Sequence, residues 1–214
     1  MRKVVCLVII AFAIVLTSCD GESLTGSVFD DHNGVAYDDG SGISDIMDGK
    51  HFFYGNLHSH TDYSDGDGTP AQAFNWARNT AGYDFYAVTD HAEQVSNSEW
   101  NDTGVQAANY TVNGSFIAIR GFEWSHGNGH ICVWGTSDYT SAISSSSLSS
   151  FSTWLDNNNG LASFNHPGRE SDMFNDFGYD KKTTDNIIAI ETGNKGSGNV
   201  NGEYLQHYTT ALAK

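Results

Sequence analysis

Short apolar segments, each with a histidine or a carboxylate at one end, are the feature that most constrains how this chain can fold. The first segment spans residues 51–57 and runs directly into His58 and His60. Four later residues of the same kind lie at or beside the end of an apolar segment: His91, Glu123, His130 and His166. Short apolar strands that alternate with helices favour a parallel sheet with crossover connections, in a barrel or an open α/β sheet. In a barrel, polar side chains at the carboxyl ends of the strands meet at one mouth.

Apolar periodicity and turn residues divide the chain into candidate elements. Strands are expected at residues 51–57, 84–89, 115–122, 129–134, 161–164 and 187–190. Helices are expected at residues 70–81, 98–110, 151–158 and 200–213. Thr69 and Pro70 suit the N-cap and the first position of a helix, and Gly82 and Gly160 suit helix C-terminal stops. The serines within residues 141–150 are expected to form a loop.

His58 and His60 occupy alternate positions of an extended segment, so their side chains point the same way. Two neutral imidazoles form a chelate that Asp65 can extend. The motif by itself is weak, and a polar surface loop with incidental histidines fits it as well. Five histidines and two carboxylates together favour metal ions, which would offset the cost of burying so many ionisable groups. Mixed imidazole and carboxylate ligands suit zinc, manganese or iron better than calcium or magnesium.

The composition is strongly acidic, with 10 Lys and Arg against 26 Asp and Glu and a formal net charge of −16. Such a surface repels polyanions, which argues against nucleic acid as a bulk partner and leaves only a single-strand end open as a substrate. No protein partner is predicted. A length of 214 residues suits one domain with a sizeable core.

Residues 1–19 have the pattern of a targeting signal. Arg2 and Lys3 precede an apolar run at residues 4–16, which is shorter than the roughly 20 residues that span a bilayer. The four residues that end in Cys19 resemble the lipobox of bacterial lipoproteins, in which the cysteine is lipidated and becomes the first residue of the mature chain. An ordinary secretory signal or an anchor helix is the alternative. The resemblance predicts an exported protein, lipid-anchored to a bacterial membrane in the periplasm or at the cell surface.

The rest of the chain divides into a linker and one domain. Residues 20–50 are rich in Gly, Asp and Ser, and they are expected to form a flexible tether. Residues 51–214 form the candidate folded domain, which carries the histidines and carboxylates named above. Cys132 is the cysteine that remains after Cys6 and Cys19, so no intramolecular disulfide is expected in the mature chain. Its place in an apolar run predicts a small buried hydrophobic side chain.

From about Phe52 onward, the chain resembles the polymerase and histidinol phosphatase (PHP) family of metal-dependent phosphoesterases. Five motifs in the family's order carry the resemblance: His58-Ser59-His60 with Ser64-Asp65-Gly66, Thr89-Asp90-His91, Gly121-Phe122-Glu123, Gly129-His130 and His166-Pro167. The resemblance implies a distorted, TIM-like (β/α)7 barrel with a three-metal cluster at its mouth.

The resemblance also implies which residues hold the metals, with Glu123 shared between two of them. The first metal would be held by His58, His60 and Glu123, the second by Glu123, His130 and His166, and the third by Asp65 and His91. Asp90 would not bind a metal itself but would orient His91 or a bound water.

One motif of the family is absent. The family's last strand supplies an Asp-x-His pair, and the residues after Glu191 contain none. We therefore expect the barrel to lack its last strand and the chain to be a truncated gene product or a fragment, with an open seam and an exposed sheet edge. The alternative is a natural short form with a two-metal core to which Glu191 contributes.

The implied activity is hydrolysis of phosphate esters in small phosphorylated molecules or nucleotides. Two or three divalent metals would share a water whose pKa falls towards about 7, and the resulting hydroxide would attack phosphorus. Arg169 could clamp a phosphate oxygen, although a surface ion pair with Glu170 or Asp172 suits it equally. A catalytically inactive, surface-anchored ligand-binding module on the same fold is the alternative, and hydrolysis of a different bond is a third.

Overall fold

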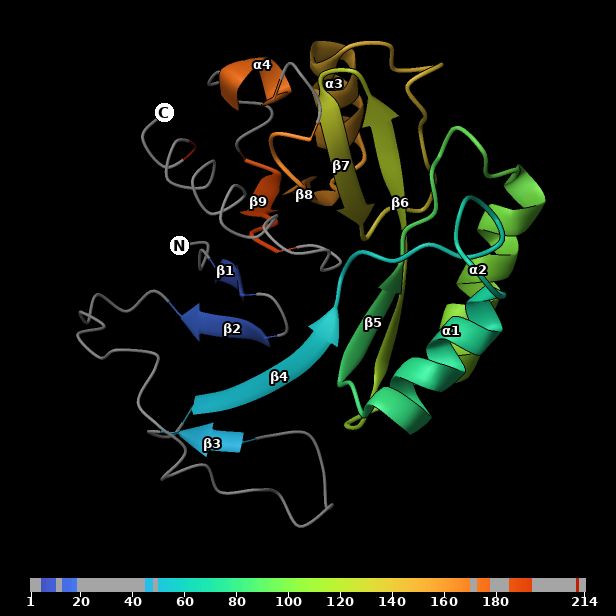
Figure 1. Ribbon diagram of the computed structural model, residues 1–214, viewed down its shortest axis with the longest axis vertical. Coiled ribbons are helices and arrows are strands. Elements are labelled where there is room, and N and C mark those ends of the chain that lie inside the picture. Colours follow the sequence, from blue (N-terminus) through green and yellow to red (C-terminus); the bar gives the residue numbers. More distant parts are fainter. Residues whose placement is uncertain are drawn as a thin grey trace.

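The computed structural model describes residues 5–10, 13–18, 45–47, 50–169, 173–177, 185–193 and 211. These residues form a mixed α/β fold around a curled sheet (Figure 1). The strands are β1 (Val5–Ile10), β2 (Ala13–Ser18), β3 (Asp45–Met47), β4 (Lys50–Asn56), β5 (Phe85–Val88), β6 (Ile117–His126), β7 (Gly129–Trp134), β8 (Leu161–Asn165) and β9 (Ile187–Ile190). The helices are α1 (Pro70–Trp76), its π-helical continuation η1 (Ala77–Ala81), α2 (Asn97–Tyr110), α3 (Leu148–Asn157) and α4 (Met173–Phe177).

The strands are neither all parallel nor all antiparallel. Their order across the sheet is β1-β2-β4-β5-β6-β7-β8-β9, and β3 pairs with β4 outside this path. β4, β5 and β6 are parallel neighbours, as are β8 and β9, whereas β7 is antiparallel to both β6 and β8. The expected α/β class is confirmed, but the expected parallel alternation is wrong from β6 to β8. The (β/α)7 count stays a prediction.

A hairpin replaces the expected crossover between β6 and β7. His126 pairs with Gly129, which leaves Gly127 and Asn128 to form the turn. Two residues can reverse the chain between antiparallel strands, whereas a parallel connection needs about a dozen or more. β6 also continues past its predicted end, because its first half pairs with β5 and its second half with β7. Glu123 therefore lies within β6 rather than after it.

The helix between β4 and β5 begins and ends at the predicted residues. Thr69 caps α1 in a capping box, and Pro70 is the first helical residue. Gly82 adopts the left-handed conformation after η1, with φ 68°, which glycine tolerates better than other residues.

Helix α3 begins earlier than expected, because Ser147 caps it. The Ser147 side chain accepts a hydrogen bond from the backbone N–H of Ser150, and the helix starts at Leu148. The serine-rich segment is therefore not a loop throughout. Asn159, with φ 51°, takes the left-handed position after the helix that was expected for Gly160.

Two groups of buried side chains hold the helices against the sheet. α1 and α2 cover β5 and the first part of β6 (Figure 1), where Phe74, Val88 and Phe116 are buried. On α3, Phe151 stacks on Trp124 of β6, with 4.6 Å between ring centroids. Each large apolar side chain of this kind contributes roughly 1.5–3 kcal/mol on burial. This packing holds the ends of the strands, and the loops that follow them, in place.

The structure describes parts of the predicted signal and linker. β1 and β2 fall within residues 1–19, and β3 and the first residue of β4 fall within residues 20–50. β1 lies beside β9 (Figure 1). Cys19 and, apart from Ala211, the expected helix at 200–213 lie outside the described residues. In the described part of the chain, no helix combines the length and the apolar character needed to cross a membrane.

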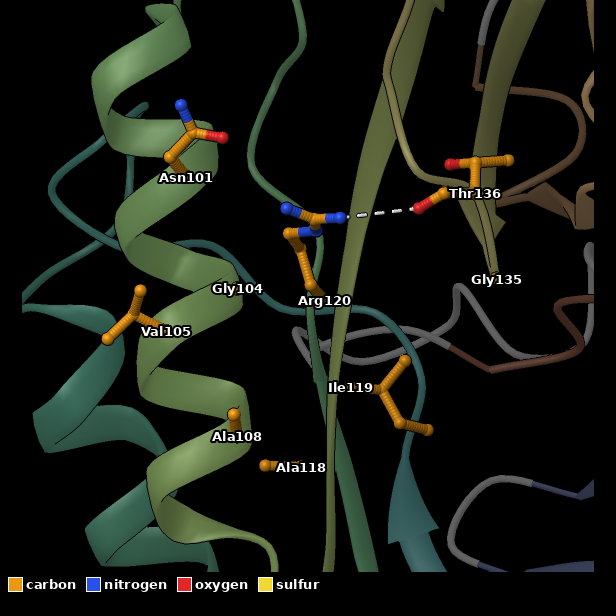
Figure 2. Close-up of a pocket in the computed structure, with 9 residues that line it drawn as sticks. All are labelled: Asn101, Gly104, Val105, Ala108, Ala118, Ile119, Arg120, Gly135 and Thr136. Carbon is orange, nitrogen blue, oxygen red and sulfur yellow. Dashed lines mark hydrogen bonds between the residues drawn. The ribbon is translucent and has the colours of Figure 1, made fainter.

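An open groove of about 590 Å³ lies between α2 and β6 (Figure 2). The guanidinium of Arg120 lies 4.0 Å from the centre of the Trp100 ring, and its Nη2 donates to the Thr136 carbonyl over 3.4 Å. A Cβ on Gly104 would lie 2.7 Å from Nη1 of this arginine, so glycine makes room for it. None of the predicted ligands lines the groove, and we assign Arg120 a packing role between α2 and β6.

Candidate metal centre

The carboxylate of Glu123 is the centre of a cluster of imidazole rings. Its side chain is 1% exposed. Five histidines each place a ring nitrogen close to one of its two oxygens: His58 (3.1 Å), His60 (3.5 Å), His91 (3.0 Å), His130 (3.5 Å) and His166 (3.3 Å). All six residues are ligands predicted from the sequence, and the structure brings them together.

The sheet topology explains how distant residues reach one place. Three strands lead into four of the rings: β4 into His58 and His60, β5 into His91, and β8 into His166. His91 forms a parallel bridge with Glu123 of β6. His130 is the second residue of β7 and pairs with Ser125 of β6. Because β7 is antiparallel to β6, its beginning lies at the same edge of the sheet as the ends of the parallel strands.

Asp65, the seventh predicted ligand, lies on the loop after β4. Its side chain is 59% exposed, and its Oδ1 lies 3.6 Å from His60 Nδ1 and 3.5 Å from His91 Nε2. Asp65 therefore forms the outer, solvent-facing rim of the cluster, whereas Glu123 forms its buried floor.

Two further residues join the cluster that the predicted ligand set did not contain. Glu191, directly after β9, places Oε1 3.3 Å from His58 Nδ1 and accepts the backbone N–H of His166 at 2.6 Å. Asn165 donates from Nδ2 to Glu123 Oε1 at 2.7 Å. The sequence suggested Glu191 only as an alternative ligand, because it follows an apolar strand. Nothing in the sequence pointed to Asn165 as part of the site, apart from its position directly before His166.

The ionisation of the cluster follows from its burial and crowding. Burial raises the pKa of Glu123, but the His58 charge and hydrogen bonds from neighbouring histidines outweigh it, and the pKa falls well below its usual range. Burial and repulsion from His58 lower the pKa of His60 to about 4. Burial also lowers the pKa of His58, yet the carboxylates of Glu123 and Glu191 raise it above its usual value. The two Nε2 atoms of His58 and His60 lie only 3.1 Å apart, so they share at most one proton.

These residues fit divalent transition metals. Glu123 Oε2 is buried and accepts no hydrogen bond, although three ring nitrogens surround it. Among the described residues, four groups of three potential ligands have donor atoms within 4.8 Å of one another. Imidazole nitrogen with carboxylate oxygen is the donor set that zinc, manganese and iron accept. A metal ion would satisfy the buried oxygen and neutralise the carboxylate.

Cys132 lies beside the cluster as a neutral thiol. It is fully buried, and burial raises its pKa to about 12. Its sulfur accepts a hydrogen bond from Asn165 Nδ2 at 3.0 Å. The prediction of a small buried hydrophobic side chain is confirmed.

Two further residues were predicted to act at the site, Asp90 and Arg169. Asp90 is 3% exposed, and its two oxygens accept hydrogen bonds from Thr61 and Ser64. It therefore faces the loop after β4, not the ring of His91. Arg169 is exposed three residues after His166, and its suggested ion-pair partners at 170 and 172 lie outside the described residues.

A curled α/β sheet with imidazoles and a buried carboxylate at its strand ends defines a candidate metal-binding fold. No family model and no curated protein matches the chain. Among solved structures, the chain shares its fold with a protein from Bifidobacterium adolescentis that is provisionally assigned as a metal-dependent phosphoesterase. The TM-score is 0.50 at 13% identity, and the match covers 74% of this chain and 83% of that one.

Two other solved structures match with a TM-score of 0.45. One is a two-domain protein from Bacteroides vulgatus that contains a predicted PHP-like metal-dependent phosphoesterase, at 19% identity over 73% of this chain. The present chain spans 45% of the length of that protein. The other is an amidohydrolase from Chromobacterium violaceum with bound sulfate and no metal, at 15% identity over 72% of this chain and 82% of that one.

Proposed function

We propose that this chain is a metal-dependent hydrolase that cleaves phosphate esters. The observation that carries the proposal is the buried carboxylate of Glu123 with five imidazole rings around it. The fold shared with a provisionally assigned phosphoesterase supports the choice of reaction. The resemblance of the motifs to the PHP family supports it independently of the fold.

The proposed ligands fall into two inner groups and one outer pair. The inner groups are His58 and His60 with Glu123, and His130 and His166 with Glu123. The outer pair is Asp65 and His91. Donor atoms within 4.8 Å of one another are found for the second inner group, and also for His60 and His91 with Glu123. Bound zinc, manganese or iron would act as a Lewis acid and lower the pKa of water towards about 7.

The residues of the chain prepare the site for that chemistry. Glu123 stays ionised, since its pKa is held below the usual range, and Asn165 fixes one of its oxygens. We propose that Arg169, which is exposed near His166, binds an oxygen of the phosphate. With a net charge of −16, the surface favours small phosphorylated molecules or nucleotides over long nucleic acid.

We also propose that the protein is exported and lipid-anchored through Cys19, with residues 20–50 as a tether. The support is the positive start, short apolar run and lipobox-like sequence of residues 1–19. Labelling with a radioactive fatty acid in a bacterial host tests this. Incorporation that disappears in Cys19→Ala supports the anchor, and equal labelling of both chains contradicts it.

The test of the activity is release of phosphate from an aryl phosphate in the presence of manganese or zinc. We expect turnover by the wild type and a loss of at least about 100-fold in His58→Ala, because outer-sphere changes alone already cost 10–100-fold. His126→Ala is the matched control. His126 is also a histidine at a strand end, the last residue of β6, but its ring stacks on Trp124 with 5.0 Å between ring centroids.

Each result separates the proposal from its rivals. Metal binding without any turnover would favour a ligand-binding module on the same fold. Turnover of a carboxylic ester or an amide, with none of a phosphate ester, would favour a metal-dependent hydrolase of another bond. Equal loss in both histidine variants would contradict the assignment of His58.

A further inference from the structure

We propose that Ser64 is a positioning residue that fixes the ring of His60, and that Asp90 acts on the ring through this serine. The inference rests on the proposed function in that it assumes a ligand role for His60. It goes further by assigning which nitrogen of His60 carries the proton and which residues decide it.

The direction of the hydrogen bonds follows from the donors and acceptors present. Ser64 Oγ lies 2.6 Å from Asp90 Oδ1 and 3.3 Å from His60 Nδ1. Asp90 Oδ1 also accepts the backbone N–H of Thr61, which marks it as an acceptor, so the single hydroxyl hydrogen of Ser64 points to Asp90. The oxygen of Ser64 then has only lone pairs to offer, and it accepts a hydrogen bond from the Nδ1–H of His60.

This arrangement leaves the other ring nitrogen of His60 available to a metal. Nε2 lies 3.5 Å from Glu123 Oε2 and 3.1 Å from His58 Nε2. A histidine binds a metal through its unprotonated nitrogen, and the hydrogen bond at the opposite nitrogen decides which one that is. Ser64 thus turns the unprotonated nitrogen towards the floor of the cluster.

Asp90 is suited to hold the serine in this state. It accepts hydrogen bonds from the backbone N–H and the hydroxyl of Thr61, both at 2.6 Å, in addition to that of Ser64. Burial raises the pKa of Asp90, and the three short hydrogen bonds oppose that rise because they favour the ionised form. The carboxylate also ties the loop that carries His60 to the end of β5.

The rings of His58 and His91 have other partners, so the hydrogen bonds that link His60 to Ser64 and Ser64 to Asp90 act on His60 alone. Ser125 Oγ lies 2.6 Å from His91 Nδ1, and Glu191 Oε1 lies 3.3 Å from His58 Nδ1. Of these three rings, His60 is the one whose hydroxyl partner is backed by a buried carboxylate. Removing Ser64 should therefore disturb one ring and leave the other two.

The test measures the protonation of the His60 ring nitrogens by ¹⁵N NMR in the full, metal-free chain, with His60→Gln used to assign the signals. We expect the Nδ1–H form to dominate in the wild type and to lose its dominance in Ser64→Ala. Ser64→Thr, which keeps the hydroxyl, should restore it. Ser59→Ala is the matched control, because the Ser59 hydroxyl lies on the same loop but donates to the Ala87 carbonyl at 2.7 Å.

A second measurement is zinc affinity by calorimetric titration. Ser64→Ala should weaken zinc binding about 10–100-fold, and Ser64→Thr should recover most of the affinity. A wild-type His60 with the proton on Nε2, or a Ser64→Ala variant with an unchanged ring, would overturn the proposal. These NMR results do not depend on turnover, so a wild type that binds no metal would refute the proposed function and leave the assignment of Ser64 to be judged on the NMR alone.

Discussion

Glu123→Gln is the substitution that most directly tests the metal centre. Glutamine keeps the shape of the side chain and removes its charge. Three of the four groups of potential ligands among the described residues contain Glu123, and the fourth consists of His58, His166 and Glu191. We therefore expect the variant to lose most of its metal binding, with at most one weak site left.

The expected size of the effect can be worked out as a shift in Tm. A ligand at 100 times its Kd stabilises the folded state by about 2.7 kcal/mol. In a protein of this size each kcal/mol raises Tm by about 2–4 °C, so zinc or manganese should raise the Tm of the wild type by roughly 5–11 °C. In Glu123→Gln we expect a rise below about 2 °C. The assay is calorimetric unfolding with and without metal, and the difference between the two scans removes any change in metal-free stability.

Glu99→Gln is the matched control for this experiment. This substitution removes the same charge at the partly exposed third residue of α2, where Glu99 belongs to a capping box that glutamine also satisfies. This variant should keep the full rise in Tm. A rise in Glu123→Gln equal to that of the wild type would refute the role of Glu123 as the shared ligand.

Three further predictions concern the surroundings of the site. Glu191→Gln should weaken metal affinity about 10–100-fold in a calorimetric titration, because it removes the negative charge 3.3 Å from His58 Nδ1. Gly55→Ala should destabilise the fold by about 1–3 kcal/mol in urea unfolding, because a Cβ there would lie 2.2 Å from the Phe85 carbonyl oxygen. The thiol of Cys132, whose pKa is raised to about 12 by burial, should resist iodoacetamide in the folded protein and react after unfolding.

Each of these predictions has a control and a result that counts against it. A metal affinity in Glu191→Gln equal to that of the wild type would show that Glu191 does not contribute to metal binding. Gly127→Ala is the control for Gly55→Ala, since a Cβ at residue 127 would have no neighbouring atom within 4 Å. Equal stability of the two variants would contradict the close approach of β4 and β5. Thiol labelling needs a chain with serine at Cys6 and Cys19, and rapid labelling of the native state would contradict the burial of the thiol.

The six residues that the structure gathers around Glu123, including Glu123 itself, could be chosen from the sequence because each lies at or near an apolar strand. A strand that ends in a polar residue places that residue at the edge of the sheet, whatever the rest of the fold. His58 and His91 illustrate this, since each follows its strand by only a few residues. The position of Glu123 inside β6 could not be predicted from the sequence, because it depends on the pairing of β6 with β7 across a two-residue turn.

The hydrogen-bond partners of Asp90 could not be predicted from the sequence either. Adjacency along the chain suggested His91, but consecutive residues of an extended segment point to opposite sides. Asp90 consequently faces Thr61 and Ser64. The same limit applies to Glu191, whose contact with His58 joins residues 133 positions apart and requires the whole sheet to be in place.

The β6–β7 hairpin has a consequence for the order in which the site assembles. Glu123 and His130 lie on adjacent strands of one hairpin, and hairpins form in about 1–10 μs. The contact between His58 and Glu191 closes a loop of most of the chain and should come late, because long loops cost entropy before their contacts form. The hairpin would thus bring two of the proposed ligands together first, and full metal affinity would mark the moment at which β4 and β9 have both reached their final places.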